Sequence, residues 1–271
     1  MKIGSREFQT KGHTYVMGIL NVTPDSFSDG GRWNDRDRAL KRVEEMVMQG
    51  ADLIDIGGES TRPGYTPVET EEEIARTAPM IEAVKARFDV PVSLDTCKSK
   101  VALAGIQAGA DLINDIWGLK RDEKMAAVIS ESGLPCCLMH NRQKAEYENF
   151  MQEAAADLAE TLRLAEKAGI GEDRIILDPG IGFAKSYEQN LEMINCLEEL
   201  QVLGCPLLLG CSRKSVIGLT LDLPADQRLE GTLATTVIGV IKGCMFVRVH
   251  DVQENVRAVR MTEAILRGGR N

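Results

Sequence analysis

Polar and charged residues follow short apolar runs at several places along this chain. They are Asn21, Asp55, Asp95, Asn114, His140, Asp178, Ser212, Lys214, Arg248 and His250. A single polar residue after an apolar run is typical of a turn or a helix cap. A whole series is typical of a ligand site, because carboxylates accept hydrogen bonds and cations donate them. We therefore expect these side chains to form one site around a small ligand that carries phosphate.

The apolar runs predict the elements that position these residues. Runs rich in β-branched residues or leucine predict strands at 15–20, 53–56, 92–94, 112–114, 136–139, 175–178, 207–210 and 245–248. Amphipathic stretches with a helical period lie between them, and several end at glycine, as 43–49 does before Gly50 and 106–108 before Gly109. The segments 49–56, 108–115 and 242–249 form a weak repeat, each with a glycine before a strand.

This alternation of strands and helices predicts the α/β class and a (β/α)₈ TIM barrel with a single domain over residues 1–271. The carboxyl ends of the strands then converge on one face, which is where this fold carries its active sites. We expect residues 1–14 to cap the barrel floor. A doubly wound nucleotide-binding sheet is disfavoured, because the sequence contains neither GxGxxG nor GxxxxGK[ST].

Composition and charge exclude several classes of protein. The net charge of −9 disfavours nucleic acid as a partner, because no basic face can be assembled. No apolar run approaches the length of a membrane span, and the first residues lack the apolar core of a signal peptide, so we expect no membrane partner and a cytoplasmic protein. The seven cysteines form no CxxC pair, which favours reduced thiols, and Cys97 is interpreted as a small apolar residue.

Seven segments together closely resemble the dihydropteroate synthase family. They are MGILNVTPDSFSDGG (17–31), DIGGESTRPG (55–64), SLDT (93–96), IND (113–115), DPGIGFAKS (178–186), GCSRKS (210–215) and RVHD (248–251). The resemblance implies that the chain joins 4-aminobenzoate to 6-hydroxymethyl-7,8-dihydropterin diphosphate in folate biosynthesis, with release of diphosphate and the help of Mg²⁺. It also implies a homodimer and a target of sulfonamides.

The resemblance assigns a pterin-binding role to four residues. Asp95 and Asp178 should accept hydrogen bonds from the guanidine-like edge of the ring, for which acceptor-only carboxylates are suited. Asn114 carries both a donor and an acceptor and can bind the mixed edge. Lys214 resembles the family lysine that reaches the ring carbonyl and fixes the orientation of the ring.

The departing diphosphate needs positive charge, which Arg248 and His250 supply. Asn21, by resemblance, helps to hold the metal ion, and Thr61 and Arg62 add donors from a glycine-flanked loop. The family favours breakage of the C–O bond to diphosphate before the neutral arylamine attacks. Asp25, Asp55 and Arg213 also match the family segments, but the sequence leaves their roles unassigned.

The aminobenzoate slot is expected between Phe27, Pro63 and Phe183. Its carboxylate should lie near Ser215 at the start of a helix, where backbone N–H groups favour anions. The segments 114–120 and 139–142 differ from the sequences that are more common in the family, so the detailed shape of the pocket is not predicted.

Structural interpretations stand beside these functional ones. Asp178 before Pro-Gly is a common turn starter, and Asp95 could cap a helix that starts near Lys98. Phe27 and Phe183 could be core residues, Arg62 a surface ion pair, and His250 a structural histidine. Two further functions also remain open, namely a pterin-binding barrel of the corrinoid methyltransferase type and a noncatalytic pterin carrier. The STRPG and SRKS segments argue against the methyltransferase type, and the retained phosphate and metal residues argue against the carrier.

Overall fold

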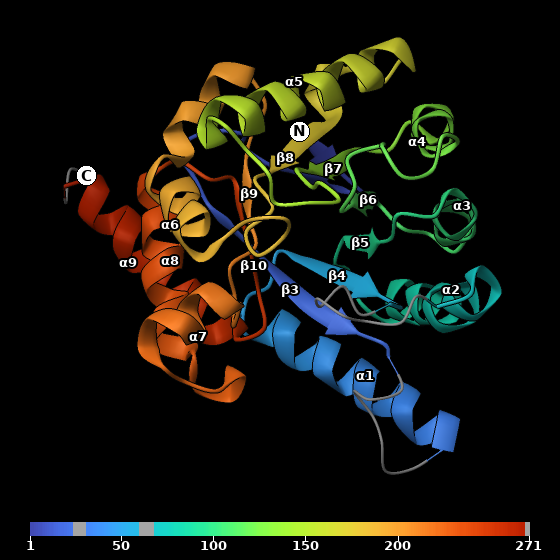
Figure 1. Cartoon of the computed structure of the whole chain (residues 1–271). Helices are drawn as coiled ribbons and strands as arrows, with labels where there is room; N and C mark the ends of the chain where they lie inside the picture. Colours follow the sequence, from blue (N-terminus) through green and yellow to red (C-terminus); the bar gives the residue numbers. More distant parts are fainter. Residues whose placement is uncertain (24–30, 60–67, 269–271) are drawn as a thin grey trace.

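A computed structural model describes residues 1–23, 31–59 and 68–268, with no side-chain description for 31–35. Its centre is an eight-stranded parallel sheet with the spatial order β8-β7-β6-β5-β4-β3-β10-β9 (Figure 1). The strands are β3 (Tyr15–Asn21), β4 (Leu53–Gly57), β5 (Val92–Asp95), β6 (Leu112–Asp115), β7 (Cys136–Met139), β8 (Ile175–Asp178), β9 (Leu208–Leu209) and β10 (Phe246–Val249). A parallel bridge between Leu177 and Leu207 joins the two edges and closes the sheet into a barrel.

Helices surround this barrel, and the cartoon shows them on its outside (Figure 1). They are α1 (Gly31–Met48), α2 (Thr70–Arg87), α3 (Ser99–Gln107), α4 (Met125–Ser132), α5 (Phe150–Lys167), α6 (Tyr187–Asn195), α7 (Ser215–Leu221), α8 (Leu229–Ile241) and α9 (Val252–Leu266). Short 3₁₀ turns lie at Glu172–Arg174, Leu197–Leu203 and Ala225–Gln227. The predicted single-domain α/β barrel is confirmed.

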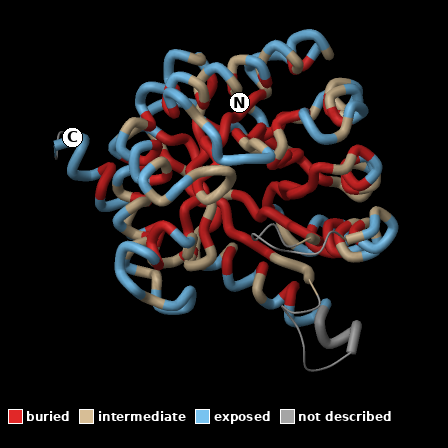
Figure 2. Tube along the Cα trace, in the orientation of Figure 1, coloured by how far each residue is buried: buried red, intermediate tan, exposed pale blue. Residues whose placement is uncertain are grey.

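The strands are buried and the outer helix faces are exposed, as Figure 2 shows. The predicted helix stops at Gly50 and Gly109 also hold, since both adopt a positive φ, of 98° and 102°. This left-handed conformation strains residues with a Cβ, so glycine is the favoured residue there. The turn that follows sends the chain directly back into a strand.

The strand boundaries correct the expectation in detail. The first four strands each run one residue further than predicted, because ladder pairing continues through Asn21, Gly57, Asp95 and Asp115. The strand expected at 207–210 is only Leu208–Leu209, since the register to β10 pairs just two residues and the chain then turns. The last strand is shifted by one residue, to Phe246–Val249.

An N-terminal hairpin of β1 (Lys2–Ile3) and β2 (Arg6–Glu7) lies outside the main sheet. Ile3 and Phe8 are buried in a cluster with residues from the early parts of the strands, among them Met17, Leu53 and Phe246. These contacts support our proposal that residues 1–14 cap the barrel floor. No helix in the described ranges is long and apolar enough to span a bilayer.

Candidate active site

The ladder register brings the polar strand residues to one level of the barrel. Asn21 pairs with Gly57, Gly57 with Asp95, and Asp95 with Asn114 across four neighbouring strands. Asp178 pairs with Met139 at the ends of β8 and β7. Since parallel strands all end on the same face, these side chains form one layer at the mouth of the barrel.

Two buried ion pairs that share Arg248, one with Asp55 and one with Asp95, lie at the centre of this layer. Arg248 Nε donates to Asp55 Oδ2 at 2.6 Å, and Arg248 Nη2 donates to Asp95 Oδ2 at 2.8 Å. Asn114 Nδ2 donates to the same Asp55 oxygen at 3.4 Å. Asp55, whose role the sequence left unassigned, is fully buried within β4. There it binds both Arg248 and Asn114.

Burial and charge set the protonation of this cluster. Burial raises the pKa of Asp95 to about 7, with Arg248 opposing the shift and Asp55 adding to it. Burial disfavours the charged form of Arg248, but the carboxylates of Asp55 and Asp95 outweigh this cost and raise its pKa. Arg248 therefore stays charged while Asp95 can titrate near neutrality.

Two carboxylate oxygens of the cluster lack hydrogen-bond partners among the described residues. They are Oδ1 of Asp55 and Oδ1 of Asp95, and both are buried. A buried acceptor without a donor costs free energy, so such atoms are suited to accept hydrogen bonds from a ligand. The alternative interpretation of Asp95 as a helix cap does not hold, because the N-cap of α3 is Lys98 and Asp95 pairs with Arg248.

Asp178 combines a structural role with a position in the polar layer. Its Oδ1 accepts from the backbone N–H of Gly180 at 2.7 Å, as a turn starter does. Its Oδ2 points toward Gly210, where an added Cβ would lie 3.5 Å from this oxygen and 3.9 Å from Lys214 Nζ. Burial raises the pKa of Asp178, and the positive charge of Lys214 opposes that shift. The two side chains therefore face the same point at the barrel mouth.

Lys214 bridges the polar layer and an aromatic ring. Its ammonium donates to the carbonyl of Ile181 and lies 4.6 Å from the centroid of the Phe183 ring. Burial lowers the pKa of Lys214, while the carboxylate of Asp178 acts to raise it. Lys214 thus has donors within reach of a ligand bound between Asp178 and Phe183.

An apolar wall adjoins the carboxylates, and most of its residues were not predicted from the sequence. Cys97, Ile116 and Met139 are buried together, and Trp117 and Phe183 pack against them. Phe183 is therefore a partly buried member of a small cluster at the strand ends rather than of the main core. Burial raises the pKa of the Cys97 thiol to about 12, which agrees with its interpretation as a small apolar residue. The only sequence signal for Ile116 and Met139 is their position at the ends of two strands.

His250 lies at the edge of the site beside Ser212. Its Nδ1 is 2.9 Å from Ser212 Oγ, and its backbone carbonyl accepts from Arg42 Nη2 at 2.7 Å. Arg213 pairs with Asp251 through Nε at 3.1 Å and has a positive φ of 59°. Arg213 thus supports the backbone between Ser212 and α7, and Ser215 is the exposed first residue of that helix.

Several predicted site residues lie outside the described residues: Asp25, Phe27, Thr61, Arg62 and Pro63. Asn21 ends β3, and its Oδ1 lies 3.7 Å from the Cβ position of Gly57, beside Asp95. Over the ranges that the structure describes, no three His, Cys, Asp or Glu residues gather to hold a metal ion. Asn21 offers one hard oxygen ligand, which fits a Mg²⁺ ion that takes its other ligands from phosphate and water.

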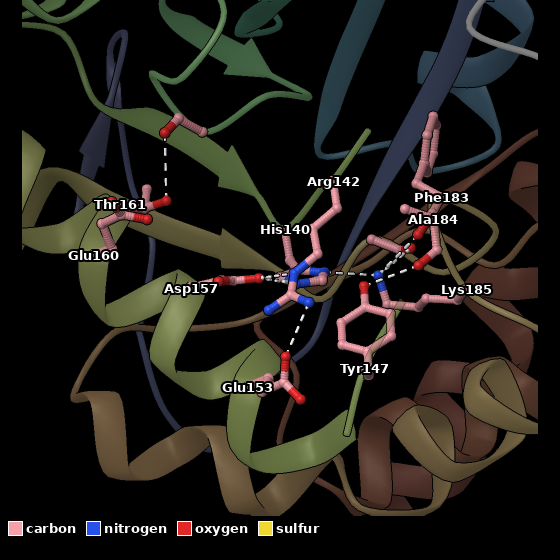
Figure 3. A network of polar contacts seen from close by, with 12 residues as sticks. His140, Arg142, Tyr147, Glu153, Asp157, Glu160, Thr161, Phe183, Ala184 and Lys185 are labelled. Atoms are coloured by element: carbon pink, nitrogen blue, oxygen red, sulfur yellow. Dashed lines mark hydrogen bonds and ion pairs between the residues drawn. The ribbon is translucent and has the colours of Figure 1, made fainter. Parts of the chain in front are cut away.

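A second polar network, which the sequence analysis did not predict, adjoins the site. His140 directly follows β7 and contacts both Lys185, in the loop after β8, and Asp157 on α5 (Figure 3). The sequence indicates His140 only as one of the polar strand ends, and Lys185 only as part of a motif. Their contact depends on how two neighbouring loops fold together, for which the sequence gives no separate signal.

The arrangement suits a flat, nitrogen-rich ring. Buried carboxylates and an amide provide acceptors, a lysine provides a donor beside them, and an apolar cluster adjoins them, against which the face of a ring could pack.

Comparison with known proteins assigns the family. The family described as pterin binding enzyme matches residues 17–250. The dihydropteroate synthase of Clostridium beijerinckii is 60% identical over 268 residues, covering 98% of this chain and 100% of that protein.

Two solved structures are similar over nearly their whole length. A dihydropteroate synthase from Clostridium difficile in the presence of pteroic acid has a TM-score of 0.92 and 47% identity, covering 98% of this chain and 99% of that one. The enzyme from Xanthomonas albilineans with 4-aminobenzoic acid has a TM-score of 0.90 and 41% identity, covering 94% and 93%. The chain therefore belongs to the dihydropteroate synthases, which are pterin-binding enzymes of folate biosynthesis.

Proposed function

We propose that this enzyme condenses 6-hydroxymethyl-7,8-dihydropterin diphosphate with 4-aminobenzoate to give 7,8-dihydropteroate and diphosphate, at the mouth of the barrel. The observation that carries the proposal is the buried layer of Asp95, Asn114 and Asp178, in which Asp95 Oδ1 has no hydrogen-bond partner in the described part of the chain. A pterin edge supplies the N–H donors that this layer lacks.

The pterin ring would lie between the carboxylates and the apolar wall. Asp178 and Asp95 accept from its guanidine-like N–H groups, and Asn114 binds the edge that has both donors and acceptors. Lys214, whose ammonium donates to the Ile181 carbonyl, turns to the ring carbonyl. Ile116 and Met139 cover the ring face. Arg248 acts behind Asp95, where it donates to the second carboxylate oxygen. Asp55 binds Arg248 from the other side, and the charges of both residues shift the pKa of Asp95.

The departing diphosphate is proposed to be bound by Arg248, His250, Thr61 and Arg62. Two nitrogens of Arg248 already serve Asp55 and Asp95, so only part of its charge is available for the leaving group. Asn21 would hold Mg²⁺, which supplies charge stabilisation to the diphosphate when it is bound. The single amide oxygen fits a metal ion that arrives with its phosphate ligands.

The bond changes need little proton transfer from the protein. The C–O bond between the pterin methylene and diphosphate breaks, and its electron pair leaves with the diphosphate oxygen. The resulting cation is stabilised by the electron-rich dihydropterin. The neutral amine of 4-aminobenzoate attacks the methylene carbon with its lone pair and then loses a proton to water. Catalysis therefore depends on positioning the amine and on stabilising the leaving group.

The 4-aminobenzoate slot is proposed between Phe27, Pro63 and Phe183, with the carboxylate of the substrate near Ser215. The X. albilineans relative with 4-aminobenzoic acid supports this substrate, and the partly buried Phe183 beside Lys214 supports the location. Sulfonamides mimic 4-aminobenzoate in shape and charge, so the enzyme is proposed to be their target.

A homodimer is also proposed, with an apolar surface on α7, α8 and α9 as its support. This surface exposes Leu219, Leu221, Ile241, Met261 and Ile265, and α8 packs beside α9 and α7. Exposed apolar side chains clustered on neighbouring helices are typical of a protein interface. Light scattering of the purified chain should give twice the monomer mass.

A coupled assay tests the proposed reaction. Dihydropterin diphosphate, 4-aminobenzoate and Mg²⁺ are supplied together with pyrophosphatase, and phosphate release and dihydropteroate are both measured. We expect one diphosphate for each dihydropteroate and no release without 4-aminobenzoate. Pterin binding without either product would instead indicate a carrier, and methyl transfer would indicate the methyltransferase type.

A further inference from the structure

The loop after β8 holds its shape through side chains that bind its backbone carbonyls. Lys185 Nζ donates to the carbonyl of Gly180 at 2.9 Å and to that of Phe183 at 3.1 Å. Lys214 donates to the Ile181 carbonyl, and the hydroxyl of Tyr147 donates to the Ala184 carbonyl at 2.8 Å. Phe183 is thus fixed by its own carbonyl and by those of its neighbours.

The loop also packs closely against the end of β7. A Cβ on Gly180, which has a positive φ of 70°, would lie 2.0 Å from the carbonyl oxygen of His140. The backbone N–H of Phe183 donates to the Gly180 carbonyl at 3.1 Å, so this same carbonyl receives both Lys185 and the Phe183 backbone. A change at Lys185 is therefore transmitted directly to the Phe183 backbone.

His140 connects Lys185 to α5, as Figure 3 shows. Lys185 Nζ lies 2.8 Å from His140 Nδ1, and His140 Nε2 lies 3.0 Å from Asp157 Oδ2. An ammonium group only donates, so Nδ1 accepts and Nε2 carries the proton that is donated to Asp157. Burial lowers the pKa of His140 to about 4, which keeps the ring neutral and able to accept.

Arg142 contacts Asp157, the last residue in this series of contacts. Its Nε donates to the Asp157 oxygen at 2.6 Å, and its Nη1 donates to Glu153 at 3.0 Å. Its guanidinium also stacks over the ring of Tyr147, 4.2 Å from the centroid. Because Tyr147 binds the Ala184 carbonyl, α5 and the Phe183 loop are linked twice, through His140 and through Tyr147.

We propose that Lys185 is a positioning residue for 4-aminobenzoate. Lys185 holds the ring of Phe183 in place through its contacts with the Gly180 and Phe183 carbonyls and with the His140–Asp157 pair. The inference rests on the proposed function, in which Phe183 lines the aminobenzoate slot. Lys185 does not touch the reacting atoms in this account. It acts on the shape of the slot, while Asp95, Asn114 and Asp178 bind the pterin.

The charge of Lys185 matters because three acceptors surround its nitrogen. A protonated amine offers three N–H donors, one for each acceptor, whereas a neutral amine offers two and must give up one of the three contacts. Burial lowers the pKa of Lys185 to about 7, and Asp178 and Asp157 oppose this shift while Lys214 and Arg142 add to it. The slot should therefore lose its shape as the pH rises through this range.

The test uses steady-state kinetics of Lys185→Met, which keeps an unbranched apolar side chain but removes every donor. At saturating dihydropterin diphosphate we expect the KM for 4-aminobenzoate to rise by about tenfold or more, as a lost charged hydrogen bond would cause. The Kd for the pterin should change by less than about threefold. Lys144→Met is the matched control, because that lysine is 76% exposed and its pair with Glu146 spans 3.7 Å.

A pH series supplies a readout that a general loss of stability would not move. In the parent enzyme the KM for 4-aminobenzoate should rise above about pH 7, and this rise should be lost in Lys185→Met. Asp157→Asn provides a second variant if Lys185→Met does not fold, since it keeps the shape of the side chain and removes the charge that orients His140 and pairs with Arg142. We expect it to raise the same KM by a smaller factor.

The outcomes separate this inference from the proposed function. An unchanged KM in both Lys185→Met and Asp157→Asn, or an equal loss of pterin affinity, would overturn the role of Lys185. If Phe183→Ala raises the KM for 4-aminobenzoate but Lys185→Met and Asp157→Asn do not, Phe183 still lines the slot and only the role of Lys185 is wrong. If Phe183→Ala also leaves the KM unchanged, the slot itself is misplaced and the inference fails with it.

Discussion

Replacement of Asp55 by asparagine isolates the contribution of the buried ion pair. Asp55 is fully buried, and its Oδ2 accepts from Arg248 at 2.6 Å and from Asn114 at 3.4 Å. Asparagine keeps the shape and one acceptor but removes the charge. Arg248 retains its contact with Asp95 at 2.8 Å, so its charge is not left unpaired.

The magnitude follows from these contacts. Loss of a charge-assisted hydrogen bond costs about 1.5 to 3 kcal/mol, and full loss of a buried partner costs about 3 to 5 kcal/mol. Because Asp95 still pairs with Arg248, we expect Asp55→Asn to lower the free energy of unfolding by about 2 to 3 kcal/mol. Urea denaturation measures this change through the midpoint, provided that the m-value is unchanged.

The effect should also depend on pH with a definite sign. The folded-state pKa of Asp95 is raised to about 7, so the stability that it contributes is complete below its unfolded pKa and is lost as the pH rises through about 7. The charge of Asp55 adds to that upward shift, so the variant should show a smaller loss over the same range. The destabilisation by Asp55→Asn should therefore be larger at about pH 5.5 than at about pH 8.

Glu146→Gln is the control for this prediction, because Glu146 and Lys144 form an exposed pair, with side chains 77% and 76% exposed. Its removal should change the free energy of unfolding by less than about 0.5 kcal/mol. If Asp55→Asn costs no more than this control, or costs the same at both pH values, the central ion pair does not hold the site in the way described.

Two further predictions concern the ligands. Pterin affinity should rise as the pH increases through about 7, because an ionised Asp95 accepts from the ring more strongly than a protonated one. Asp95→Asn should flatten this rise in a fluorescence titration, and an identical profile in the variant would assign the titration to another group. A sulfonamide should raise the apparent KM for 4-aminobenzoate without lowering the maximal rate, whereas inhibition that persists at saturating 4-aminobenzoate would place its site elsewhere.

Much of the fold could be predicted from local sequence. A buried parallel strand is a short apolar run, and the polar residues that follow such runs are expected to meet at one face. Asn114 and Asp178 can be found in this way, because each ends such a run. The exact strand ends are less predictable, since ladder pairing decides them, as at Asp95 and Asn21.

The roles of Asp55 and Lys185 could not be predicted from local sequence. Asp55 meets Arg248 only because the barrel brings together residues 193 positions apart. Lys185 meets His140 because two neighbouring loops fold against each other, with 45 positions between them. Both contacts depend on side-chain directions in the closed barrel, and neither leaves a periodic pattern in the sequence.

Calorimetric titration of a pterin into Asp178→Asn tests the central claim most directly. Asparagine replaces a charged acceptor by a group that is partly a donor, and the structure places Asp178 in the buried layer beside Lys214. We predict that the folded variant binds the pterin about 2 to 3 kcal/mol more weakly, roughly 30- to 150-fold, than the parent enzyme does. Unchanged affinity in a variant with the parent's unfolding midpoint would contradict the account, because the pterin would then bind without the layer at the mouth of the barrel.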